Sequence, residues 1–193
     1  MEKGILYNKA GEMIINSYGK DHHAIPHLQR TAYWLGKLKP DADEAFLIAA
    51  LAHDVQRAFD APKGEKKPPK PKGGFLDKDI MKYHQERGGE IMEEFLLKEG
   101  TSPEFAQRVR HLISRHELGG DADQDFLKDM DSLSFLENNI DFFLSNVENS
   151  ADKDEVRKKF TWMFERISSD KARKLAEPFY KTAIDKLNKV GEK

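Results

Sequence analysis

An apolar run, Ala-Phe-Leu-Ile-Ala-Ala-Leu-Ala at residues 45–52, limits the possible folds of this chain, and it is followed directly by His53 and Asp54. At helical spacing this run is apolar on every side, and a helix of that kind is normally buried all round. An ionised carboxylate at the end of a buried helix is costly unless it is paired or bound to a cation. The fold must therefore enclose this helix and give Asp54 a positive partner.

Length and composition are those of an ordinary globular protein. The chain has 193 residues, of which 34% are charged and 38% hydrophobic, and its formal net charge is −2. One domain is the default at this length. We therefore expect a single domain over residues 1–193, with a motif-bearing core at about 21–138 and C-terminal helices at 152–190 packed on it. The small net charge argues against a nucleic-acid polymer or a membrane surface as partner.

The chain contains no cysteine, which excludes disulfides and thiolate metal sites. Any metal must then be bound by His, Asp or Glu. No apolar run approaches the roughly 20 residues of a membrane span, and the first residues do not resemble a signal peptide. We therefore expect a cytoplasmic protein, and an oligomer is possible.

Helical periodicity dominates the chain, and runs rich in β-branched residues are missing, so we predict an all-α fold. Asp43 and Asp79 are expected to be N-caps, and Ser102 stands before Pro103 in the arrangement typical of a helix start. The pair Gly119-Gly120 is expected to close a helix that ends near residue 117. The predicted helices cover residues 2–18, 26–38, 43–58, 79–98, 103–117, 124–146, 152–167 and 170–190.

The segment APKGEKKPPKPKGG at residues 61–74 stands apart, because its four prolines allow neither a helix nor a central strand. From residue 57 to residue 72 the chain carries six basic side chains against two acidic ones. Such a segment is either a solvated insert or a functional loop. Because this basic stretch begins at Arg57, three residues after Asp54, we expect it to attract an anionic substrate and to bring Lys70 and Lys72 to that substrate.

Helical phase separates inward-facing histidines from bystanders. In the predicted helix at 103–117, His116 continues an apolar row that includes Leu112, whereas His111 points roughly the opposite way. In the helix at 79–98, His84 shares an apolar face with Gly88, which would leave room beside it.

Two acidic residues of the predicted helix at 124–146 can be sorted in the same way. Asp131 lies in a row with Ser134 and faces the interior, whereas Asp129 points away. Inward-pointing imidazoles and carboxylates thus come from five helices, and they are His27, His53, Asp54, His84, His116 and Asp131. A single inward histidine is more often a hydrogen-bonded core residue than a ligand, but a shared divalent cation would satisfy all these groups together. Imidazole and carboxylate suit Fe, Mn, Co, Ni or Zn.

The order of these groups resembles the HD-domain superfamily of metal-dependent phosphohydrolases. DHHAIPHLQRTAYWL is similar to the opening helix of that family, and AALAHDVQR is similar to its second helix. YHQERGGEIMEEFL resembles the helix that supplies a further histidine in many members, and DMDSLSFLE resembles the closing segment with its ligand aspartate. The resemblance covers about residues 21–138.

The resemblance implies an all-α, HD-domain-like helical bundle with a metal site between its helices. It implies that four residues bind metal, namely His27, His53, Asp54 and Asp131. Members with two metals would add His84 and His116, with Asp54 bridging. The cofactor would be one or two divalent transition metal ions, Fe, Mn, Co, Ni or Zn.

The activity implied is hydrolysis of a small phosphorylated substrate, a nucleotide or another phosphate ester, by a metal-activated water. Asp54 would belong to the catalytic centre, and Arg57 follows it by about one turn, where it could contact phosphate. His23 lies one turn before His27. Three roles are open for it: general acid, support of a metal ligand, or contact with the substrate. Glu117 is a weaker candidate for support of His116.

Two further arginines hold comparable positions. Arg30 stands one turn after His27 and Arg87 one turn after His84, and arginine suits bidentate phosphate binding. The alternative is that these arginines are surface or ion-paired residues.

Two other functions remain open at this point. A di-iron oxygenase could use the same ligand set, and an HD protein could bind a ligand without turnover, although the complete ligand set disfavours the latter. Redox-active iron would indicate oxygenation, whereas a redox-inert cation with phosphate release would indicate hydrolysis.

Overall fold

The computed structural model describes residues 4–59, 74–149 and 152–191, and within these ranges all regular structure is helical. The described residues form nine α-helices and two short 3₁₀-helices, with no strand among them, so the all-α prediction is confirmed. The elements are α1 (Ile5–Tyr18), α2 (Ala24–Leu38), α3 (Glu44–Ala52), η1 (Val55–Ala58), η2 (Gly74–Leu76), α4 (Lys78–Lys98), α5 (Pro103–Ile113), α6 (Ala122–Asn138), α7 (Ile140–Asn149), α8 (Lys153–Glu165) and α9 (Asp170–Lys189).

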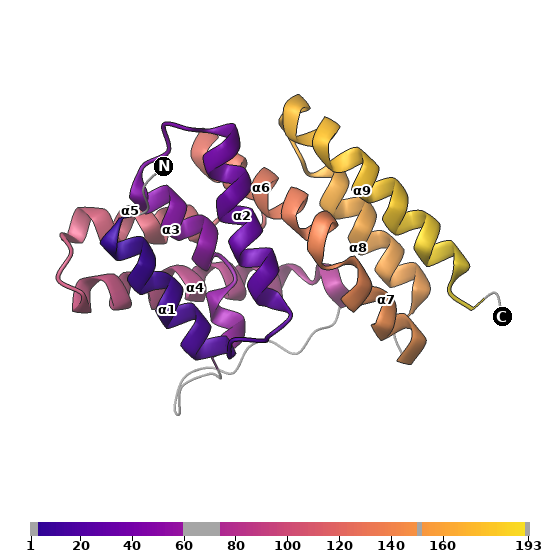
Figure 1. Cartoon of the computed structure of the whole chain (residues 1–193), viewed down its shortest axis with the longest axis horizontal. Coiled ribbons are helices and arrows are strands. Elements are labelled where there is room, and N and C mark those ends of the chain that lie inside the picture. The colour runs from indigo at the N-terminus through magenta and orange to yellow at the C-terminus, as the bar shows by residue number, and fades with distance from the viewer. Residues whose placement is uncertain (1–3, 60–73, 150–151, 192–193) are drawn as a thin grey trace.

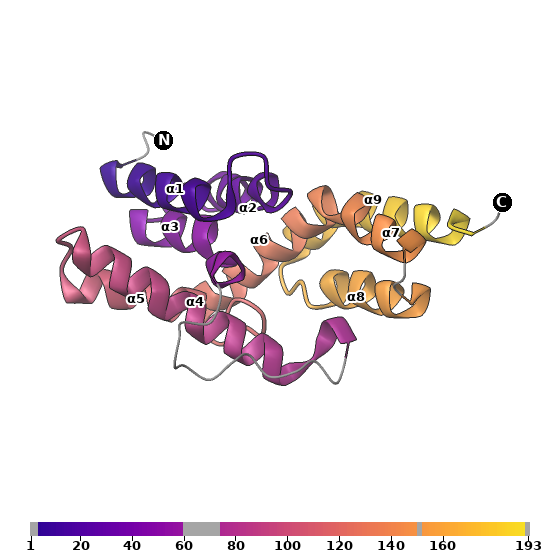
Figure 2. The same cartoon turned by 90° about the horizontal axis from the view of Figure 1, so that it is seen from below.

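Helix α3 is enclosed on all sides, as its apolar sequence predicts. Its residues from Ala45 to Ala52 are buried except for Leu47, which is half-buried. It packs against α1, α2 and α5, and Figure 2 shows it between α1 and the layer formed by α4 and α5. The side chain of Asp43 caps its first turn by accepting from the Phe46 amide at 2.8 Å, as predicted.

The predicted helix at 43–58 is wrong beyond Ala52, because the chain turns at His53 and Asp54 and continues as η1. The Tyr18 hydroxyl of α1 donates to the Asp54 carbonyl at 2.7 Å, which fixes this turn against α1. The local pattern could not show the break, because it depends on a partner 36 residues away.

Other helix ends differ from prediction by a few residues. Helix α5 starts at the predicted Ser102 cap but ends at Ile113, so His116 lies in the turn that follows. Helix α4 is capped by Asp77 rather than Asp79, since Asp77 accepts from two backbone amides of the first turn. The predicted helix at 124–146 is two helices, α6 and α7, which meet at Asn139.

Helix α6 joins the two parts of the molecule. Figure 1 shows α1 to α5 on one side of it and α7 to α9 on the other. It packs against α2 on the first side and against α8 and α9 on the second. Buried apolar residues from Tyr7 to Leu187 form one connected core cluster. No described helix has the length and apolarity required to cross a membrane.

Two glycines let α4 approach its neighbours closely. A Cβ added at Gly88 would lie 3.3 Å from the carbonyl oxygen of His53 and 3.3 Å from the side chain of Ile113. A Cβ added at Gly89 would lie 2.9 Å from the carbonyl oxygen of Arg110. These contacts bring α4 directly against α5 and against the turn that carries His53.

Asp129 points away from Asp131, as the helical phase predicts, but it does not face solvent. It is buried and accepts from the amides of Ser168 and Ser169 at 2.8 and 2.7 Å, and from the Ser168 hydroxyl at 3.1 Å. The carboxylate therefore ties the loop before α9 to the middle of α6.

We expect Asp129→Ala to lower the free energy of unfolding by about 1–3 kcal/mol, because the amides of Ser168 and Ser169 lose their hydrogen bonds to a buried charged acceptor. Urea denaturation followed by circular dichroism measures this change. The control is Asp141→Ala, which removes an exposed carboxylate paired with Lys186. A surface ion pair contributes at most about 1 kcal/mol. Equal stability of the two variants would contradict the anchoring role of Asp129.

Candidate metal centre

Two clusters of possible metal ligands lie side by side under one cavity. The first consists of His27, His53 and Asp131, and the second of Asp54, His84, His116 and Glu117. Within each cluster the ligand atoms lie within 4.8 Å of one another. The adjacent residues His53 and Asp54 belong to different clusters, so the turn after α3 links the two.

In the first cluster, two imidazole nitrogens and one carboxylate oxygen converge. The Nε2 atoms of His27 and His53 are 3.1 Å apart, and Asp131 Oδ1 lies 3.2 and 3.4 Å from them. The Ser134 hydroxyl donates to the His27 carbonyl, so its oxygen accepts from His27 Nδ1 at 3.1 Å. His53 Nδ1 lies 2.9 Å from the Ala50 carbonyl and donates to it. Both imidazoles therefore carry hydrogen on Nδ1 and direct Nε2 to the same point.

Two lone pairs facing each other in this way need a proton or a metal ion between them. Burial alone would lower the pKa of His53, but the carboxylates of Asp131 and Asp54 outweigh it and raise that pKa to about 9. The first cluster therefore attracts positive charge.

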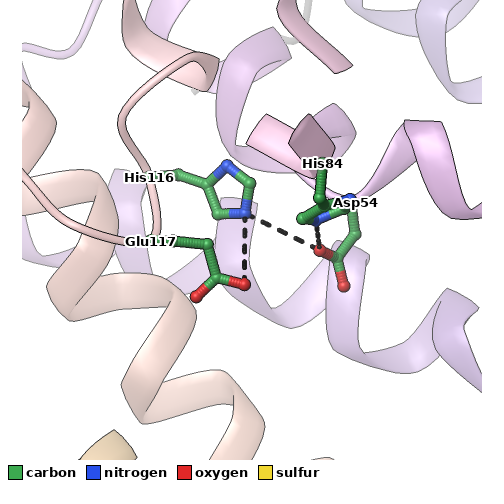
Figure 3. A group of neighbouring side chains, drawn as sticks. All are labelled: Asp54, His84, His116 and Glu117. Atoms are coloured by element: carbon green, nitrogen blue, oxygen red, sulfur yellow. Dashed lines mark hydrogen bonds and ion pairs between the residues drawn. The ribbon is translucent and has the colours of Figure 1, made fainter. Parts of the chain in front are cut away.

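In the second cluster, one imidazole nitrogen has no partner among the described residues. His116 donates from Nδ1 to the Ile113 carbonyl at 2.8 Å, and its buried Nε2 accepts no hydrogen bond from them. Figure 3 shows this Nε2 between two carboxylates, 3.7 Å from Asp54 Oδ1 and 4.0 Å from Glu117 Oε1. A buried lone pair beside two carboxylates is the donor set that a divalent cation requires.

His84 completes the second cluster from α4. Its Nε2 lies 2.6 Å from Asp54 Oδ1, and its Nδ1 lies 3.0 Å from the side-chain oxygen of Gln56. Burial is the main cause that lowers the pKa of His84, to about 4, so the neutral form dominates at neutral pH. With Nδ1 donating to Gln56, a neutral His84 points the lone pair of its Nε2 at the Asp54 carboxylate. A cation bound between the two groups would remove the repulsion between them.

Asp54 lies among positive and neutral partners, and for this reason its carboxylate can be buried. Burial would raise its pKa, but Arg57, His84 and His53 outweigh that effect and hold the pKa well below its usual range. The structure groups its carboxylate with the second cluster, whereas the resemblance implies a residue shared between both.

A single arginine that the sequence did not reveal contacts both clusters. Arg166 follows the end of α8 and donates to Glu117 Oε2 at 2.7 Å and to the Glu117 carbonyl at 2.9 Å. It also donates to the Ser132 hydroxyl at 2.7 Å and to Asp131 Oδ2. No local pattern marks this residue, because it lies outside the motif-bearing segments and its partners are 34 or more residues away.

A cavity of about 370 Å³ lies over the clusters. Asp54, Glu117 and Asp131 lie at its floor, and Arg57 and Lys159 contribute basic side chains to its wall. Burial would raise the pKa of Glu117, but Lys159 and Arg166 outweigh it and lower that pKa to about 2. A larger cavity of about 650 Å³ lies along α1 and α2, and no cluster residue lines it.

The other predicted site residues divide into two groups. His23 and Arg57 line the cavity; Arg57 Nε is 3.1 Å from Asp54 Oδ1, and a terminal nitrogen is 3.6 Å from Glu117 Oε1. Arg30 and Arg87 do not line it, so the structure does not bring them to the site. Lys70 and Lys72 lie outside the described residues.

The two excluded arginines are ion-paired elsewhere. Arg30 binds Glu137 through two nitrogens at 2.9 and 2.7 Å, and Arg87 lies 3.0 Å from Glu90. His111 is exposed and pairs with Asp121 at 2.6 Å, so it is a bystander as the helical phase predicts.

Comparisons with known proteins agree with this architecture. A family model described as "Domain of unknown function (DUF4202)" matches residues 12–187. A crystal structure described as a predicted HD superfamily hydrolase, from an uncultured Thermotogales bacterium, is similar with a TM-score of 0.55 and 18% identity. The match covers 95% of this chain and 90% of that chain, and it shows that the fold is of the HD type. No curated protein matches the chain.

We expect the purified protein to bind at least one divalent transition metal ion and Asp54→Ala to lose the ion of the second cluster, because this carboxylate lies 2.6 Å from His84 Nε2 and 3.7 Å from His116 Nε2. His84→Ala and His116→Ala should lower the metal content, whereas His111→Ala should not. Inductively coupled plasma mass spectrometry measures the content of each variant. Full occupancy in Asp54→Ala, or equal loss in His111→Ala, would contradict the assignment.

Arg166→Lys should lower the metal affinity about 10–100-fold, the usual effect of losing a partner that orients ligand groups. The substitution keeps the charge but cannot reproduce the planar set of donors. Isothermal titration calorimetry with Mn²⁺ measures the effect, and Arg110→Lys, at an exposed arginine paired with Glu93, is the control. An unchanged affinity in Arg166→Lys would show that the arginine only balances charge.

Proposed function

Because the chain belongs to the family described as a domain of unknown function, DUF4202, and has an HD-type fold, we propose that it is a metal-dependent phosphohydrolase. The observation that carries the proposal is the convergence of imidazole Nε2 atoms and carboxylates at the floor of a cavity whose wall carries Arg57 and Lys159. His27, His53 and Asp131 would hold one ion. A second ion would be held by the other cluster, Asp54, His84, His116 and Glu117.

Formal charges around the cavity favour an anionic substrate. Three carboxylates, Asp54, Glu117 and Asp131, are matched by three basic side chains, Arg57, Lys159 and Arg166. With the histidines neutral, as metal binding requires, these charges cancel. Each divalent cation then makes the centre more positive, and a phosphate monoester would offset the charge of one such ion.

A divalent cation in this place would lower the pKa of a bound water towards about 7 and polarise a phosphoryl oxygen. The side chain of Arg57 is 49% exposed at the cavity, so its guanidinium can exchange the 3.6 Å contact with Glu117 for a phosphate oxygen. His23 would contact the substrate at the cavity wall. Burial and the neighbouring His22 lower the pKa of His23, which favours a neutral imidazole that can accept a proton or donate one hydrogen bond.

The test is a panel of phosphate esters, nucleotides included, offered to protein loaded separately with Mn²⁺, Co²⁺, Ni²⁺, Zn²⁺ or Fe²⁺. We expect release of inorganic phosphate from at least one small ester, and none with Asp54→Ala, while His111→Ala keeps the wild-type rate. Oxygen consumption by the iron-loaded protein without phosphate release from any ester would contradict the proposal and favour the oxygenase alternative.

Arg57→Gln should lower kcat/KM about 10–100-fold, the loss expected for one or two charge-assisted hydrogen bonds to phosphate. Most of the change should appear in KM, because the contact already forms in the bound ground state. The metal content is measured in the same samples to exclude loss of the centre. A normal KM with a normal metal content would remove Arg57 from the substrate site.

A further inference from the structure

The wall of the cavity above the metal clusters is aromatic. His23 and Phe142 lie nearly parallel, with ring centroids 4.0 Å apart and planes 11° apart. Phe143 contacts Phe75, Phe135 and Phe142 edge to face, at centroid distances of 5.1, 5.1 and 5.8 Å. Phe75 and Phe142 remain 37% and 40% exposed although they are large and apolar. The wall thus presents flat apolar surface to whatever enters the cavity.

Lys159 adds a buried cation to the same cavity. The residue is only 7% exposed and lines the cavity, and its ammonium lies 5.4 and 4.7 Å from the ring centroids of Phe135 and Trp162. Glu117 attracts it from beyond ion-pair distance, and no described residue accepts a hydrogen bond from it. The ammonium lines the cavity without a fixed hydrogen-bond acceptor in the described part of the chain, so an anion that enters the cavity would gain a charge-assisted contact there.

Asn139 supplies an unused acceptor. It stands where α6 gives way to α7 and lines the cavity, and its buried side-chain oxygen has no hydrogen-bond partner among the described residues. Buried acceptors are normally satisfied. A hydrogen-bond donor on the ligand would satisfy this one.

We propose that the cavity binds a phosphate monoester whose organic part is a flat aromatic or heteroaromatic ring bearing a hydrogen-bond donor. The phosphate contacts Lys159 and Arg57, the ring lies on the wall formed by Phe142 and its neighbours, and the donor meets Asn139. This inference rests on the proposed function for the nature of the anionic group. The cavity of about 370 Å³ is at the small end of the range for ligand sites, roughly 300–1,000 Å³, so the ligand is a small molecule rather than a polymer.

The experiment measures binding, so it does not depend on turnover. Benzylphosphonate and heptylphosphonate carry seven carbons each and cannot be hydrolysed as esters, and both are titrated into the metal-loaded protein by calorimetry. We expect the aromatic ligand to bind about three- to tenfold more tightly, because ring–ring contacts add to apolar burial. Phe142→Leu should remove this preference while leaving the heptyl ligand unaffected.

Lys159→Met should weaken both ligands by a similar factor of at least about tenfold, as expected for loss of a charge-assisted contact. Lys158→Met is the matched control, since Lys158 is exposed and paired with Glu155. A hydroxyl on the benzyl ring should strengthen binding to the wild type but not to Asn139→Ala. The thermal stability of each variant is measured alongside to exclude unfolding.

Failure of the aromatic substrate class and failure of the proposed hydrolase function give different results. Equal binding of the two phosphonates, or equal weakening of both by Phe142→Leu, would overturn the aromatic substrate class even if simple phosphate esters are hydrolysed. A clear preference for the aromatic phosphonate, without phosphate release from any ester in the panel, would support this binding site and overturn the hydrolase proposal.

Discussion

The burial of one carboxylate determines how this protein is organised. Asp54 follows α3, a helix whose residues are nearly all buried, and its charge is retained because Arg57, His84 and His53 surround it. The same turn places His53 in the first cluster, with His27 and Asp131. Helices that are distant in sequence must converge on this turn, so the packing that buries the core also assembles the metal centre. Gly88 contributes to this convergence, because its lack of a side chain lets α4 pack closely against the turn.

The C-terminal helices belong to the site as much as the motif-bearing core does. Arg166 contacts Asp131 and Glu117, and Lys159 lines the cavity above them. Both residues lie on or just after α8, beyond the segments that resemble the HD superfamily. Asp129 anchors the loop before α9 to α6, and thereby supports the position of α8 against the centre. A fold assembled only from residues 21–138 would lack these basic groups and part of the cavity wall.

Much of the fold could be predicted because its causes are local. The apolar run at 45–52 predicted an enclosed helix, and the Asp43 and Ser102 caps marked real helix starts. His116 was placed on the correct side although α5 ends before it, because the turn that follows keeps the chain on the same face. Spacing of one turn indicated the direction of Arg30, but it could not reveal Glu137, the partner 107 residues away that holds it outside the cavity. Arg166 was missed for the same reason, since only the packed structure shows what an isolated arginine contacts.

Anomalous X-ray diffraction can show whether the two clusters bind metal. Crystals of the protein grown with Mn²⁺ or Co²⁺ are measured on both sides of the absorption edge of that metal. We expect an anomalous peak bonded to the Nε2 atoms of His27 and His53 together with Asp131, or to those of His84 and His116 together with Asp54. Two peaks, one in each cluster, would establish a dinuclear centre. Well-ordered density for these side chains with no anomalous peak within bonding distance would show that the clusters do not form a metal centre.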